Sequence, residues 1–145
     1  DCIVSANFCP EFCQPDYAFF TNSKRFEKLD LAALPCPVVL TSNLRPLPRG
    51  ALAVNYDRLA APDVQNVSLG SNSVLMLLRL LRQCGAAGVL LAGADGYRTG
   101  TAAYADAGLH THTGRGAAYN AQMAGAIRAA GLPVRFITPS EYERA

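Results

Sequence analysis

One pattern limits the fold more than any other feature of this sequence: a helical segment, a glycine, a short turn and then an apolar run, found twice. The first copy has an expected helix at 74–82, Gly85 as its end, and the apolar strand Gly88–Gly93, which we expect to be fully buried. The second copy joins a helix at 117–130 to a strand at 134–137. Tyr119, Met123 and Ile127 recur every four positions in that helix, and Gly131 is its expected end. Continuous apolar strands joined by helices are typical of a parallel sheet covered on both faces. The sequence therefore predicts an α/β fold, a three-layer α/β/α sandwich of Rossmann-like type with a mostly parallel sheet of five or six strands.

Shorter apolar segments bounded by turn residues fill the first half of the chain. They predict further strands at 3–6, 17–20, 38–40 and 51–55, a helix at 23–34 and a loop at 44–50. In the second half, residues 97–116 are expected to form a long loop, and a short helical tail follows residue 140.

Length and composition indicate one globular domain. The 145 residues, half of them hydrophobic and 17% charged, exclude a disordered chain, and no linker divides residues 1–145. The net charge is +2 and the basic residues are scattered, so we expect no nucleic-acid partner. No apolar run is long enough to cross a membrane, and the odd count of five cysteines favours reduced thiols and a cytoplasmic protein. The chain does not begin with Met, and we expect it to be a fragment of a longer protein.

Polar residues follow nearly every predicted strand. Ligands of open parallel sheets bind at the carboxyl ends of the strands, and amides offer donors and acceptors there without charge. The alternative is that these residues only form turns. The candidate ligand-binding residues at strand ends are Asn7, Asn22, Ser42, Asn43, Asn55, Asp95, Gly96 and Tyr97.

The segment Gly70–Ser73 precedes the most apolar predicted helix. Ser71, Asn72 and Ser73 are candidates for binding a phosphate at the start of that helix, and the alternative is a plain helix cap. Neither G-x-G-x-x-G nor a P-loop motif occurs. Lys24 and Arg25 begin another predicted helix, where cations are unfavourable unless an anion is bound nearby.

Candidates for catalysis are few. Asp95 ends a predicted strand and would act as a base if the protein is a transferase, or would hold a ribose hydroxyl. His110 and His112 have no carboxylate or thiol at metal spacing, so we predict a surface role for them and no metal site in this chain.

Two motifs, V-S-A-N-F-x-P-E at 4–11 and P-D-Y-x-F-F-x-N-x-K-R-F at 15–26, carry a resemblance to a known group. Together with segments 41–43, 54–56, 72–78 and 91–97, they resemble the domain that follows the barrel in HMG-CoA-lyase-like proteins, the bacterial 4-hydroxy-2-oxovalerate aldolases or pyruvate carboxyltransferase-like proteins. The strand ends are more distantly similar to sialyltransferase-like and hydroxymethylpterin-diphosphokinase-like domains.

The resemblance implies an accessory C-terminal domain of an aldolase. The aldolase (lyase) site and its divalent metal would belong to a barrel upstream in the same chain, and this fragment itself would hold no cofactor. The domain would bind a nucleotide or sugar phosphate at the strand ends. A stand-alone nucleotide-dependent transferase and an oligomerisation module, forming a homo-oligomer through the helix at 117–130, are the alternatives.

Overall fold

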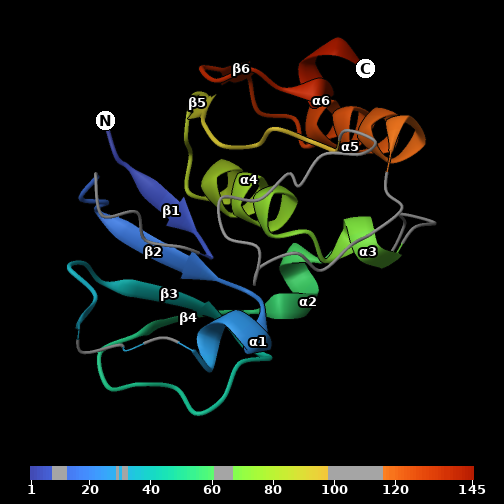
Figure 1. The fold of residues 1–145 in the computed structure, drawn as a ribbon. Helices are drawn as coiled ribbons and strands as arrows, with labels where there is room; N and C mark the ends of the chain where they lie inside the picture. Colours follow the sequence, from blue (N-terminus) through green and yellow to red (C-terminus); the bar gives the residue numbers. More distant parts are fainter. Residues whose placement is uncertain (8–12, 29, 31–32, 61–66, 98–115) are drawn as a thin grey trace. The chain divides into compact units, whose positions relative to one another are not determined.

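The computed structural model describes residues 1–7, 13–28, 30, 33–60, 67–97 and 116–145 (Figure 1). His110, His112 and nearly all of the predicted loop at 97–116 lie outside them. The chain divides into two compact units, Asp1–Leu77 and Leu78–Ala145, and each is described by itself. The expectation of a single domain stays a prediction.

A four-stranded parallel sheet forms the centre of the first unit. Its strands are β1 (Val4–Ala6), β2 (Tyr17–Phe20), β3 (Val38–Thr41) and β4 (Leu52–Val54), in the order β1-β2-β3-β4. Every neighbouring pair is parallel, as the apolar runs predicted.

The inner strands of this sheet are buried on both faces. Phe20 pairs with Leu40 in register, and both pack with Ala18, Phe26 and Leu44 in one apolar cluster. Phe19 is fully buried although it points to the opposite face, because side chains alternate along a strand. The first unit is therefore an α/β arrangement whose sheet is covered on both faces.

The helices of the first unit are short. They are α1 (Ser23–Phe26), α2 (Tyr56–Leu59), α3 (Val67–Gly70) and the beginning of α4 (Ser73–Gln83), which continues into the second unit. The predicted helix at 23–34 is thus wrong in length. Helix α1 ends at Phe26, and Glu27 and Lys28 form a turn.

The second unit is a strand–helix–strand unit, coloured from yellow-green to red in Figure 1. Strand β5 (Val89–Leu91) pairs in parallel with β6 (Val134–Phe136), and α5 (Ala117–Ala129) and α6 (Glu141–Arg144) complete it. The predicted burial of β5 is wrong, since Leu90 is 66% exposed. The described strands thus form one sheet of four and one of two, and a single sheet of five or six strands is not shown.

Helix α4 ends as its sequence predicted. The N–H of Gly85 donates to Arg82 O at 3.0 Å and the N–H of Ala86 donates to Leu81 O at 3.0 Å, which is a Schellman motif. Gly85 has a φ of 81°, a conformation that glycine adopts without strain. Within the described part of the chain, no helix is long and apolar enough to span a membrane.

Alanine substitutions at Gly85 and Gly125 distinguish the effect of backbone strain from the effect of packing. A Cβ placed on Gly85 or on Gly125 meets no atom within 4 Å, but only Gly85 has a positive φ. We expect Gly85→Ala to lower the free energy of unfolding by about 1–2 kcal/mol. Gly125→Ala, inside α5, should raise it by about 0.5–1 kcal/mol. Urea unfolding of both variants checks this, and equal effects would contradict it.

Candidate functional site

The carboxyl ends of β1 to β4 meet at one edge of the first sheet. This follows from the parallel pairing of every neighbouring strand. The candidates that come one or two residues after these strands, and so lie along this carboxyl edge, are Asn7, Asn22, Ser42, Asn43 and Asn55. The structure therefore brings together all the strand-end candidates of the first unit.

A cluster of three polar side chains joins β1, β2 and the start of α4. The Asn7 side chain accepts from Thr21 N at 3.1 Å and donates through Nδ2 to Ser73 Oγ. Ser73 Oγ and Thr21 Oγ1 lie 2.7 Å apart. Asn7 has a φ of 57°, which asparagine tolerates better than most residues. Sequence reasoning missed Thr21, whose only signal is its place between a buried strand and Asn22.

The ends of β3 and β4 are tied in the same manner. Asn43 donates through Nδ2 to Thr21 O at 3.3 Å, and Ser42 Oγ accepts from Tyr56 N at 2.9 Å. These two residues therefore hold neighbouring strand ends in register at the carboxyl edge.

Three further asparagines cap helices that begin at or beside this edge. Asn22 Oδ1 accepts from Arg25 N at 3.3 Å, at the start of α1, and Asn55 Oδ1 accepts from Arg58 N at 3.2 Å, at the start of α2. Asn72 Oδ1 accepts from Val74 N at 2.9 Å and Leu75 N at 3.4 Å, at the start of α4. The alternative of a plain helix cap thus accounts for the Oδ1 atom of each, and Ser71 lies half-buried directly before the last cap.

The amide nitrogen Nδ2 of these three capping asparagines is not used by the cap. No described residue accepts a hydrogen bond from the Nδ2 of Asn22, Asn55 or Asn72, and the first two side chains are exposed. The oxygen of each of these amides thus bonds a helix N–H, and the exposed Asn22 and Asn55 can offer their N–H donors to solvent or to a ligand. Lys24, Arg25 and Arg58 lie in the same first turns.

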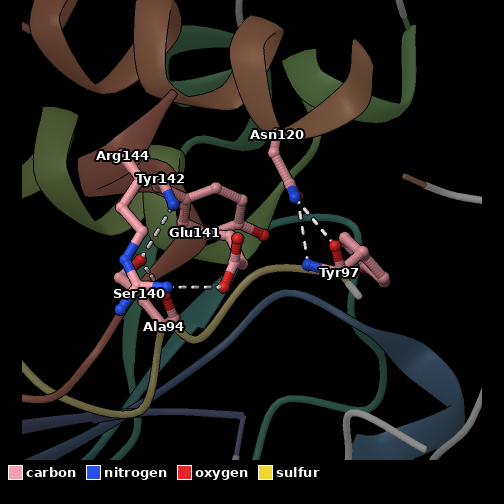
Figure 2. A network of polar contacts seen from close by, with 7 residues as sticks. All are labelled: Ala94, Tyr97, Asn120, Ser140, Glu141, Tyr142 and Arg144. Carbon is pink, nitrogen blue, oxygen red and sulfur yellow. Dashed lines mark hydrogen bonds and ion pairs between the residues drawn. The ribbon is translucent and has the colours of Figure 1, made fainter. Parts of the chain in front are cut away.

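The remaining candidates, Asp95, Gly96 and Tyr97, lie in the turn that follows β5 in the second unit (Figure 2). The Asn120 side chain pairs with the backbone of Tyr97, accepting from its N–H at 3.0 Å and donating to its C=O at 2.8 Å. Ser140 Oγ donates to Ala94 O at 2.6 Å, and Glu141 N donates to Asp95 O at 2.8 Å. These bonds hold the backbone on both sides of Gly96.

Steric contacts and backbone conformation also restrict position 96 to glycine. Its φ is 83°, and a Cβ there would lie 2.8 Å from Glu141 Cβ. The ring of Tyr97 meets that of Tyr119 edge to face, with centroids 5.2 Å apart. The carboxylate of Asp95 is exposed on this fixed turn, and no described residue bonds it.

Ionisation offers one further fact. Burial lowers the pKa of the Arg79 guanidinium in α4 from its ordinary value. Because arginine starts so far above neutrality, Arg79 still carries its charge at pH 7.

No metal centre is found in the described ranges, which contain no group of three His, Cys, Asp or Glu side chains able to hold an ion. The cysteines that the structure describes, Cys2, Cys13, Cys36 and Cys84, form no disulfide.

Two surface depressions lie away from the candidate residues. One, of about 380 Å³, lies between α1 and the loop at 45–48, and the other, of about 300 Å³, lies between α5, β6 and α6. Comparison of this chain with protein-family models, curated proteins and solved structures finds no match.

The cluster at the start of α4 gives a first prediction. We expect Ser73→Ala to lower the free energy of unfolding by about 1–2 kcal/mol, because Thr21 Oγ1 and Asn7 Nδ2 lose a partner. Thr21→Val should cost a similar amount, and the double variant should cost less than the sum by about 0.5–1.5 kcal/mol. Urea unfolding of the four proteins checks this, and additive effects would show that the hydroxyls do not interact.

The turn after β5 gives another testable prediction. Asn120 is buried and makes two bonds to Tyr97, whereas Asn43 is exposed and makes one long bond. Asn120→Ala should lower the free energy of unfolding by about 2–3 kcal/mol and Asn43→Ala by less than about 1 kcal/mol. Denaturant midpoints compare the two, and the reverse order would refute the role assigned to Asn120.

Proposed function

We propose that the carboxyl edge of the four-stranded sheet binds a phosphorylated polar ligand, a nucleotide or a sugar phosphate. The observation that carries the proposal is the hydrogen bonding of the cap amides. Asn22, Asn55 and Asn72 use Oδ1 for a helix and leave Nδ2 without a described partner. A surface of outward donors suits a ligand rich in acceptors, and phosphate oxygens are the strongest acceptors among common metabolites.

Local charge supports the same ligand class. Lys24 and Arg25 lie in the first turn of α1 and Arg58 in that of α2. Both helices are single turns, so these cations lie in the last turn as well. The support that they give is a local excess of positive charge, which favours an anionic ligand. Asp57 is the one acid in these two first turns.

The spacing of the strands sets the size of the ligand. Neighbouring strands lie about 4.8 Å apart, so the ends of β2 and β4 are roughly 10 Å apart. In this proposal a sugar phosphate, which is of similar length, spans the ends of β2 and β4 and bonds the amides of Asn22 and Asn55.

In its biological context, we propose that this chain is an accessory ligand-binding domain of an aldolase-like protein. The motifs at 4–11 and 15–26 support this context. The aldolase chemistry and its metal would belong to the barrel, so no catalytic step is derived for the residues of this chain.

A second candidate function is a nucleotide-dependent transferase with Asp95 as the base. The observation that favours it is the exposed Asp95 carboxylate on a turn fixed by Ser140, Glu141 and Asn120. The transferase function would be supported if the protein turns over a nucleotide-linked donor and the Asp95→Asn variant does not.

An asparagine-to-aspartate exchange separates the cap from the ligand donor. Asp caps helices as well as Asn, so Asn22→Asp should keep the cap to Arg25 N and change stability little. The exchange replaces the outward N–H donors by a negative oxygen, so affinity for a nucleotide or sugar phosphate should fall at least about tenfold. Calorimetric titration with a panel of both ligand classes, beside a melting curve, checks both effects.

Gln14→Glu is the matched control. It adds the same charge at an exposed position that precedes β2, at the opposite edge of the same sheet. Its affinity should stay within about twofold of the parent. No binding by the parent protein, or equal losses in the two variants, would overturn the proposal.

A further inference from the structure

The outer edge of β6 has no hydrogen-bond partner among the described residues. Val89 N donates to Pro133 O at 2.8 Å and Ile137 N donates to Leu91 O at 3.0 Å, so the odd-numbered positions of β6 face β5. Backbone groups of the intervening residues, Val134 and Phe136, therefore point away from β5. No described residue bonds them. This leaves two N–H donors and two carbonyl acceptors along one edge.

An apolar trough of about 300 Å³ adjoins this edge. Its lining includes Val134 and Phe136 of β6, Ile127 of α5, Leu132, and Tyr142 of α6. Ile127, Leu132 and Tyr142 are nearly inaccessible to solvent, so they form a packed floor beneath the opening. An apolar side chain from outside could be buried here beside the open backbone groups.

Charged residues border the trough and the strand edge. Arg128 and Glu143 lie on the trough side, and Arg135 is exposed on β6. Arg135 points to the opposite face of β6 from Val134 and Phe136, because side chains alternate along a strand. A strand paired with this edge would therefore place one set of its side chains toward the trough and the other set beside Arg135.

We propose that the outer edge of β6 and the adjoining trough bind an extended peptide segment in which apolar and acidic residues alternate. The segment adds a strand next to β6, its backbone bonding Val134 and Phe136. Its apolar side chains enter the trough and its acidic side chains lie beside Arg135.

A second copy of this chain is the less suitable occupant. Antiparallel pairing of two β6 strands around their centres would place Arg135 opposite Arg135, and like charges directly opposite destabilise a strand pair. The same geometry favours a carboxylate in that position.

The test uses the full chain and a blocked synthetic peptide of about seven alternating Glu and Val residues, a length typical of a strand. We expect the amide signals of Val134 and Phe136 to shift on titration followed by NMR. A peptide with Lys in place of Glu should bind at least about tenfold more weakly. A peptide N-methylated at alternate positions should lose binding, because it cannot complete the strand pairing.

Charge exchange on the protein completes the test. Arg135→Glu should lower the affinity for the Glu peptide at least about tenfold and raise the affinity for the Lys peptide. The control Arg144→Glu, at an exposed position on α6, should alter both affinities by less than about twofold. Equal binding of the two peptides, shifts that avoid β6, or β6 signals that depend on protein concentration without peptide would each overturn the proposal.

Discussion

The parallel arrangement of β1 to β4 is the constraint on which the first unit depends. Because all four strands run in the same direction, every strand ends at the same edge, and the chain must turn there each time. Helix starts and unpaired backbone groups consequently gather along that edge, and each needs a hydrogen-bond partner. In this sequence, asparagine side chains supply many of those hydrogen bonds.

An asparagine side chain can meet this need and still retain a free donor. Its oxygen accepts from a helix N–H, and its nitrogen remains for another partner. At Asn7 and Asn43 the nitrogen is used inside the protein, by Ser73 and by Thr21 O. At Asn22, Asn55 and Asn72 it is not used by any described residue. The structural and the ligand-binding interpretations of a strand-end asparagine are thus compatible, since they concern different atoms of the same side chain.

Sequence reasoning predicted the elements that have a long or sharply bounded pattern. The helix of Tyr119, Met123 and Ile127 was found because its buried residues recur every four positions, and Gly85 and Gly131 mark helix ends with positive φ. Helices α2 and α3 were missed because four residues show no periodicity. The shared edge of Asn7, Asn22, Asn43 and Asn55 was predictable from parallel pairing. The bonds of Thr21 and Asn120 were not, because each joins residues far apart in the chain.

The wrong prediction for β5 has a physical cause that also bears on β6. An apolar run indicates a strand but does not say which of its faces is covered, and Leu90 of β5 is open to solvent. Its partner in register is Arg135 of β6, on the same face. Strand β6 has three residues and follows Pro133, and short length, proline and charge all hinder pairing between sheet edges. Of these features, only the charge of Arg135 distinguishes one partner strand from another, and no described residue bonds the backbone groups of Val134 and Phe136. In the proposed complex the edge would therefore select its partner by charge, and the adjoining trough is the reason to propose a binding surface rather than a merely protected edge.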